Sequence, residues 1–152
     1  MTTTNLTITN GFRGLALCGL FGMLGGLGCS DDTAERPATF EAQVERGGQL
    51  FGDHCAHCHG DSGQGTSLAP AVVGEGALPL YPPAERQVRT SEFRTALDVF
   101  VFADANMPGD APGSLPDDDL IDILAFALFA NGVELDEPLS ADNAASVVIN
   151  AE

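Results

Sequence analysis

The stretch Cys55-Ala56-His57-Cys58-His59 is the most informative part of this 152-residue chain. Two residues separate the cysteines, and a histidine follows the second cysteine directly. This C-x-x-C-H pattern is typical of the covalent attachment of a c-type haem. Each thiol would form a thioether with one vinyl group of the porphyrin, and His59 would bind the iron as an axial ligand. The short spacing favours this chemistry because both sulfurs and the imidazole must meet one rigid disc.

Two other kinds of site use paired thiols of this spacing. A zinc site is one alternative, because His54, His57 and His59 surround the cysteines. Structural zinc usually takes its ligands from two separated pairs, however, and the chain has no second C-x-x-C and no H-x-x-x-H. A redox dithiol usually opens a helix in a βαβ pattern, which we do not find. We therefore expect one covalent haem c. A zinc-stabilised binding module remains an alternative only if no haem is attached.

The N-terminal segment predicts export. Arg13 is the only basic residue ahead of the apolar run Gly14–Gly28, which is short and glycine-rich and therefore typical of a signal peptide rather than a spanning helix. The run ends in Leu27-Gly28-Cys29-Ser30, which resembles a bacterial lipoprotein lipobox, with Gly26 where the lipobox prefers leucine. The resemblance implies lipid on Cys29 and a periplasmic protein anchored to a membrane. An ordinary cleaved signal, giving a soluble periplasmic protein, and an uncleaved anchor are the alternatives.

The chain is strongly acidic. It has six basic residues, all arginine, against 22 acidic residues, and a formal charge of −16. Cleavage before Cys29 removes Arg13 and no acidic residue, so the formal charge becomes −17. We therefore expect neither nucleic acid nor an anionic membrane surface as a partner. A redox partner with a basic docking surface is one expectation, and a charge that serves only solubility is the other.

Hydrophobic periodicity predicts three helices joined by loops, with no run of period-two strands. Residues 29–39 are polar and predict a tether. Residues 40–52 predict a helix that runs into the C-x-x-C-H motif, and prolines and glycines after the motif predict an irregular loop. Residues 90–103 predict a second helix with Ser91 as its cap and an apolar face of Phe93, Leu97, Phe100 and Val101.

Residues 116–131 carry the strongest helical pattern. Pro116 suits the first helical position, and the three aspartates that follow it complement the positive end of the helix dipole. Gly132 is a plausible C-terminal stop. The apolar face consists of Leu120, Ile121, Ile123, Leu124, Phe126, Ala127 and Leu128. Beyond this helix, residues 133–152 form an acidic tail that we expect to be peripheral.

This order of helices, haem motif and loops resembles the class I monohaem cytochrome c family from about Phe40 to Gly132. The family places a glycine eight residues and an aromatic residue four residues before the first cysteine, and Gly47 and Phe51 stand there. Ile123 and Phe126 match the aliphatic and aromatic pair of its last helix. The resemblance implies a small all-α fold of three to five helices around one covalent haem. The N- and C-terminal helices would cross at the glycine, and the domain would span residues 40–132 after a signal peptide over 1–28.

The resemblance also implies the remaining site residues. In the family a proline carbonyl shortly after the motif accepts a hydrogen bond from the proximal histidine, and Pro70 is at the matching position. The sixth ligand of the family is a methionine in the loop before the last helix. Met107 lies in that loop and is the only methionine left after cleavage. A thioether is a weak ligand that favours ferrous iron. The alternative is that Met107 packs on the haem edge without bonding.

Several residues near the site have no fixed role from the sequence. We expect His54 and His57 to be exposed to solvent. Any of Arg86, Arg89, Arg94 and Tyr81 could reach the haem propionates, but a surface role is the default for each. The resulting hypothesis is an electron carrier rather than an enzyme. The alternative is a haem protein that binds a small ligand or reduces peroxide after its sixth ligand is displaced. No additional acid–base constellation is evident near Met107, which weighs against this alternative.

Overall fold

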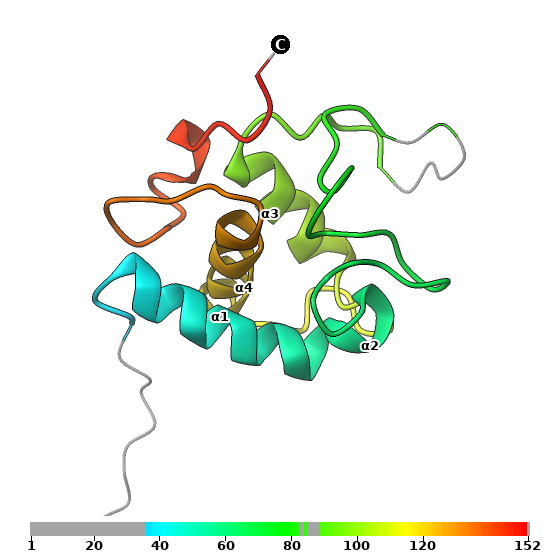
Figure 1. The fold of residues 1–152 in the computed structure, drawn as a ribbon, viewed down its shortest axis with the longest axis horizontal. Coiled ribbons are helices and arrows are strands. Elements are labelled where there is room, and N and C mark those ends of the chain that lie inside the picture. The colour runs from blue at the N-terminus through cyan, green and yellow to red at the C-terminus, as the bar shows by residue number, and fades with distance from the viewer. Residues whose placement is uncertain (1–35, 83, 85–88, 152) are drawn as a thin grey trace, which may run out of the picture. The chain divides into compact units, whose positions relative to one another are not determined.

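The structure is a computed structural model that describes residues 36–82, 84 and 89–151. Its helices are α1 (Phe40–His54), α2 (Ala56–His59), α3 (Ala96–Asn106) and α4 (Asp117–Ala130), followed by the 3-10 helix η1 (Ala144–Ser146) (Figure 1). Over these residues the backbone forms no strand beyond a single antiparallel bridge between Thr95 and Val148. The predicted all-α fold is therefore confirmed.

Part of the sequence-based prediction falls on residues that are not described. The predicted signal peptide, Cys29 and Arg86 lie outside the described ranges. Among the helices that are described, none combines the length and the apolar character that crossing a membrane requires.

Helix α1 begins where the sequence places it and extends two residues beyond Gly52, to His54. Thr39 caps its start, because the hydroxyl oxygen accepts a hydrogen bond from the backbone N–H of Ala42 at 3.2 Å. The buried residues of α1 are Phe40, Gln43, Gly47 and Phe51. Their spacing gives the helix one face that packs against the rest of the domain.

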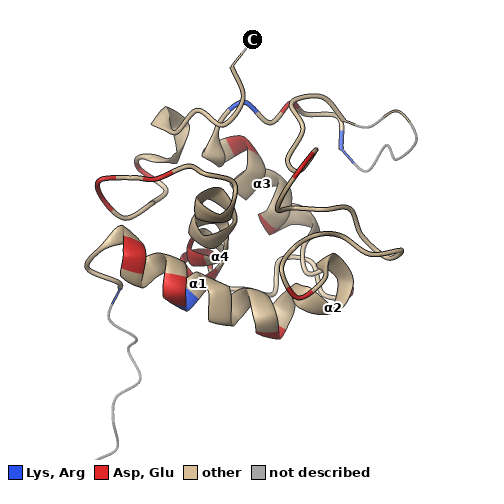
Figure 2. Cartoon of the chain, viewed as in Figure 1, with Lys and Arg blue, Asp and Glu red and all other residues tan. Residues whose placement is uncertain are grey.

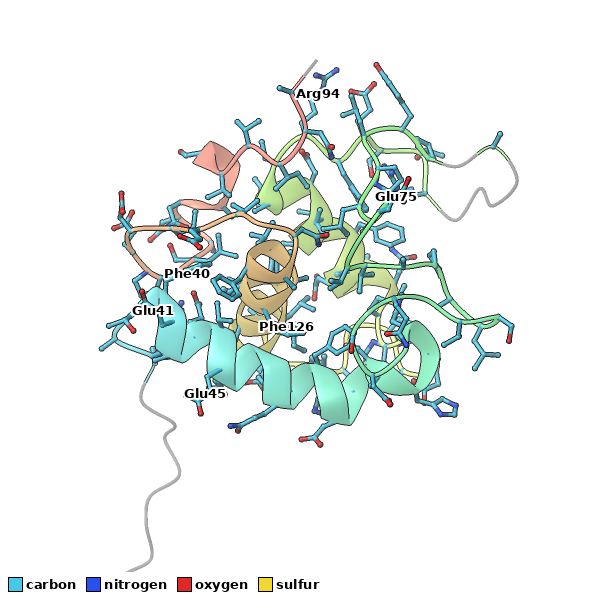
Figure 3. All side chains as sticks on the ribbon, in the orientation of Figure 1. Phe40, Glu41, Glu45, Glu75, Arg94 and Phe126 are labelled. Atoms are coloured by element: carbon cyan, nitrogen blue, oxygen red, sulfur yellow. The ribbon has the colours of Figure 1, made fainter. Side chains whose placement is uncertain are left out.

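Helices α1 and α4 cross at Gly47, as the family resemblance implies (Figure 1). A Cβ atom on Gly47 would lie 1.8 Å from the carbonyl oxygen of Asp122, so no larger residue fits at this position. The rings of Phe51 and Phe126 pack beside the crossing with their centroids 5.2 Å apart, and Figure 3 shows Phe126 between the two helices. The crossing fixes the orientation of α1 and therefore the position of the C-x-x-C-H motif at its C-terminal end.

A buried polar network ties the same two helices to the C-terminal segment. The amide nitrogen of Gln43 donates to Asp122 Oδ1 at 2.8 Å and to the carbonyl of Leu139 at 2.9 Å, and Gln43 Oε1 accepts from Leu139 N–H at 2.7 Å. Arg46 pairs with Asp119 at 2.5 Å and also contacts Asp122. The buried carboxylate of Asp122 thus has two partners on α1, Gln43 and Arg46, as a buried charge requires.

The predicted start of α3 is wrong. The helix begins at Ala96 rather than Thr90, and its cap is Thr95 rather than Ser91. Thr95 and Asp98 form a reciprocal capping box, in which Asp98 Oδ2 accepts from Thr95 N–H at 2.8 Å. Residues 90–94 lie outside the helix and bond to other segments: Phe93 N–H donates to the carbonyl of Leu80 at 3.0 Å, and the carbonyl of Arg94 accepts from Ile149 N–H at 2.9 Å. Val101, expected on the buried face, is 58% exposed.

Helix α4 matches its prediction closely. Pro116 is the N-cap rather than the first helical residue, and Asp117, Asp118 and Asp119 occupy the first turn. Gly132 follows the end of the helix with a φ of +86°, a conformation that favours glycine. Of the predicted apolar face, every residue except Phe126 is fully buried. The core of the domain therefore forms around α4.

The expectation of a peripheral tail is wrong for residues 139–150. Leu139 and Ala144 are among the most deeply buried side chains of the core, and Val147 and Ile149 pack against it. Acidic residues dominate the start of the tail, and the apolar run Val147-Val148-Ile149 is too short to predict a buried element. Figure 1 shows the orange and red segment running beside α4 and on to the start of α3.

Candidate functional site

The C-x-x-C-H motif lies where α1 ends and the single turn of α2 follows. Cys55 ends α1, and its carbonyl accepts hydrogen bonds from the N–H groups of Cys58 at 3.1 Å and His59 at 2.9 Å. This turn brings both sulfurs and the imidazole close together, as the spacing predicts. His59 is only 8% exposed, whereas the two cysteines are half-buried free thiols.

The orientation of His59 is fixed by the loop that follows the motif. Its Nδ1 lies 2.8 Å from the carbonyl oxygen of Pro70, which is the contact that the resemblance implies. Gly65 closes this loop, because its N–H donates to the carbonyl of His59 at 2.7 Å and a Cβ atom there would lie 2.7 Å from the nitrogen of Ala71. With Nδ1–H bonded to the carbonyl, Nε2 is the nitrogen that remains for a metal.

An apolar cavity of about 380 Å³ adjoins His59, and a smaller one of about 90 Å³ lies next to it. Both cavities are lined by His59 from α2 and by Met107, the C-cap residue that directly follows α3. The lining that the two share further consists of Val72, Leu78, Val99 and Ala103. A concave apolar space with few polar groups is typical of cofactor sites.

Met107 is held at the edge of the cavity by its own backbone. Its N–H donates to the carbonyl of Ala103 at 2.7 Å, and its carbonyl accepts from Gly113 N–H at 3.2 Å. The structure therefore brings together His59 and Met107, which are far apart in the sequence. His54 and His57 are exposed, as expected, and neither lines a cavity.

The state of Cys55 bears on the alternatives to haem. Burial, with a smaller effect of neighbouring Cys58, raises the pKa of the Cys55 thiol to about 11. An activated redox dithiol needs a thiolate at neutral pH, and the burial of Cys55 opposes its formation. Over the described part of the chain, no cluster of three or more His, Cys, Asp or Glu residues is arranged to hold a metal ion.

Arg89 is one of the four candidates for the haem propionates among which the sequence did not choose. Its default surface role is wrong, because it is only 7% exposed and lines the larger cavity. Its guanidinium donates to the carbonyls of Leu80 at 3.2 Å, Ser91 at 2.5 Å and Pro79, and it lies 3.7 Å from the ring centroid of Phe93. Burial lowers the pKa of Arg89. No periodic pattern in the sequence marks this burial, since its partners come from separate parts of the loop.

The other candidates for the cavity edge lie elsewhere. Tyr81 is exposed and lines neither cavity. Arg94 forms an ion pair with Glu92 at 2.7 Å. Of the candidates that the structure describes, Arg89 is therefore the one that faces the cavity.

Comparison with known proteins agrees with this geometry. The family model for cytochrome c matches residues 44–128. The chain belongs to the cytochrome c family. The cofactor of this cytochrome is therefore a covalently bound haem c. Two free thiols, a buried imidazole with one nitrogen already bonded and an apolar cavity fit that group.

One solved structure is similar to this cytochrome. The crystal structure of the sulfane dehydrogenase SoxCD from Paracoccus pantotrophus contains a chain that is 26% identical, with a TM-score of 0.52. The match covers 86% of this cytochrome and 66% of that chain, just under two thirds of its length. A search of the curated proteins finds no match.

Proposed function

We propose that this cytochrome is an electron carrier with His59 and Met107 as the axial ligands of its haem. The observation that carries the proposal is that these two residues line the same apolar cavity from α2 and from the end of α3. The haem supplies one-electron chemistry by cycling between ferric and ferrous iron. If both residues hold the iron, no coordination position would be left for a substrate, and the haem would supply electron transfer alone.

Each residue of the site has a distinct part in this proposal. Cys55 and Cys58 hold the porphyrin through thioethers, and the carbonyl of Pro70 holds the His59 ring and raises its basicity. The apolar lining excludes water and lowers the polarity around the iron, and a Met ligand raises the potential further. Both features favour ferrous iron.

Arg89 completes the site on its outer side. Its three carbonyl partners fix a cation beside the larger cavity. Propionates are the only anions that a haem brings, and a cation close to them offsets the cost of removing them from water. We assign this part to Arg89 because, among the residues described, it is the arginine that lines the cavity.

Peroxide reduction is less well supported than electron transfer. General acid–base catalysis would need a titratable group beside the open coordination position. The described lining of both cavities contains no Asp and no Glu, and its one histidine is His59 itself.

A second candidate follows from the similar solved structure. A dehydrogenase releases electrons that an acceptor must take up, and the SoxCD structure contains a chain 26% identical to this cytochrome. We therefore propose, as a narrower version of the same function, that this cytochrome accepts electrons from a dehydrogenase. Co-purification with a dehydrogenase subunit would support this version, and a protein that purifies alone and accepts electrons from no dehydrogenase would count against it.

A potentiometric titration of the purified holoprotein tests the electron carrier. We expect one reversible one-electron transition, with unchanged spectra after repeated cycles, and no peroxide turnover above that of free haem. An irreversible transition, or steady peroxide consumption, would argue for the ligand-binding alternative.

We also propose that the protein is anchored to the periplasmic side of a bacterial membrane by lipid on Cys29. The support is the short apolar run that ends in Leu27-Gly28-Cys29. Fractionation of the native protein and of Cys29→Ser tests this proposal. The native protein should sediment with membranes and the variant should not, whereas a native protein found in the soluble exported fraction would disprove the anchor.

A further inference from the structure

We propose that the C-terminal segment Val147–Asn150 is a strap that holds the outer wall of the haem cavity, with Asn150 as its positioning residue. The proposal rests on the haem site described above. The strap lies beyond residues 44–128, which the family model matches, so its role is not implied by family membership.

Asn150 joins two segments of the cavity wall through a single side chain. Its amide nitrogen donates to the carbonyl of Leu78 at 2.9 Å and to the carbonyl of Phe93 at 2.7 Å. Both residues line the larger cavity, and Leu78 also lines the smaller one. The amide therefore fixes the separation of two wall segments that are far apart in the sequence.

The strap has its own anchors on the backbone at the start of α3. Ala96 N–H donates to the carbonyl of Val147, and Ile149 N–H donates to the carbonyl of Arg94, both at 2.9 Å. Val148 forms the bridge with Thr95. Figure 1 shows the red end of the chain beside the start of α3. These backbone bonds place Asn150 at the wall without the help of its side chain. A substitution can therefore remove the two side-chain hydrogen bonds and leave the strap in its position.

Leu78 is the part of the wall that most needs support. Its φ is +44°, and it is the only described residue other than glycine with a positive φ. A residue with a branched side chain adopts this left-handed conformation only where surrounding contacts hold it. The hydrogen bond from Asn150 to its carbonyl is one such contact. Without it, Leu78 is free to return to an ordinary conformation and to leave the wall.

Loosening this wall should expose the iron. Leu78 and Met107 line the same two cavities, so movement of Leu78 opens the space beside the proposed sixth ligand. A thioether is a weak ligand that an added imidazole can displace when it reaches the iron. The strap would thus keep outside ligands away from the iron.

The test is imidazole binding to the ferric holoprotein, followed by its absorption spectrum. Asn150→Ala removes both hydrogen bonds to the wall. Asn143→Ala is the matched control, because Asn143 bonds only within the tail, to the carbonyl of Pro138 at 2.9 Å and to the N–H of Ser140 at 2.8 Å. We expect Asn150→Ala to bind imidazole about tenfold more tightly than wild type, the effect of about one hydrogen bond's free energy. Asn143→Ala should bind it as wild type does.

If wild type and both variants bind imidazole with equal affinity, the proposed role of the strap is wrong. If Asn150→Ala fails to retain haem, Asn150→Ser, whose hydroxyl can donate one hydrogen bond, gives the same comparison with a smaller expected shift. Hydrogen exchange gives a second readout that does not depend on Met107: the Phe93 N–H, bonded to Leu80, should exchange faster in Asn150→Ala only. A wild type that binds imidazole as tightly as Met107→Ala would instead disprove the proposed sixth ligand.

Discussion

Cys55 and Cys58 stand on either side of one backbone turn, and each is assigned one thioether. We predict that haem stays with the polypeptide on a denaturing gel, since two covalent bonds survive unfolding. The single variants Cys55→Ser and Cys58→Ser should keep haem through the remaining bond, in lower amounts, and the double variant should lose it. Haem staining of the gel measures all four proteins. A wild-type band without haem would contradict attachment through these thiols.

Residues bound by their neighbours in the sequence were predictable, and residues bound by distant segments were not. The contact of His59 with the Pro70 carbonyl was implied by the family resemblance, because Pro70 lies at the matching position shortly after the motif. Arg89 was given a surface role because its three carbonyl partners come from residues 79, 80 and 91, which only the tertiary path of the loop brings together. The sequence alone does not encode that path in a readable pattern.

At the scale of the helices, Gly47 is the position where α1 and α4 leave no room for a side chain. We predict that Gly47→Ala destabilises the holoprotein by about 1–3 kcal/mol, because the Cβ atom would overlap the backbone of Asp122. Gly52→Ala, in the same helix but with open space around it, is the matched control and should add about 0.5–1 kcal/mol of stability. Denaturant unfolding measures both. Equal effects of the two substitutions would contradict the close crossing.

Asp98 stabilises the start of α3 in a pH-dependent way. Burial alone would raise the pKa of its carboxyl, but hydrogen bonds from Thr95 and Arg94, with the charge of Arg94, lower it overall. A lowered folded-state pKa means that the stabilisation is complete above the unfolded value of about 4 and is lost as the pH falls through the folded value. Asp98→Asn should therefore cost about 1 kcal/mol at pH 7 and progressively less below pH 4. Thermal unfolding across this range measures it, and a cost that does not change with pH would contradict it.

The helices differ in how far local sequence determined them. Helices α1 and α4 were predicted because their apolar faces are periodic, and for α4 also because Pro116 and Gly132 mark its two ends. For α3, Ser91 and Thr95 both suit a cap, and the choice depends on bonds from residues 93–96 to Leu80 and Val147. Distant segments therefore fixed the start of that helix.

At the scale of the molecule, contacts with distant segments also explain why the burial of the tail was not predicted. Its acidic residues suggested an exposed segment, yet Leu139 is fully buried and exchanges two hydrogen bonds with Gln43 of α1. The apolar run Val147-Val148-Ile149 is too short to give a periodic signal. Only the folded domain shows that the tail completes its core.

The charge of the whole protein predicts how it meets its partners. Figure 2 shows acidic residues on several elements, and Figure 3 shows Glu41 and Glu45 on the side of α1 turned away from α4. Arg36, Arg46 and Arg94 are each within ion-pair distance of a carboxylate, which leaves the long-range field negative. We expect electron transfer from a basic redox protein to slow as salt shortens the Debye length from about 30 Å at 0.01 M to about 8 Å at 0.15 M. An acidic redox protein is the control and should react faster with added salt.

Stopped-flow kinetics over a salt series measures both rates. A rate with the basic protein that does not change with ionic strength would show that the charge serves solubility and that docking depends on apolar contacts instead.

The absorption spectrum of the ferric protein tests the central claim, His59 and Met107 as axial ligands, most directly. Iron bound to a thioether sulfur gives a weak band at the near-infrared edge, which wild type should show. In Met107→Ala the band should disappear and the reduction potential should fall, since the ligand that favours ferrous iron is gone. A wild-type spectrum without the band, or a band that persists in Met107→Ala, would contradict the assignment of Met107 as the sixth ligand.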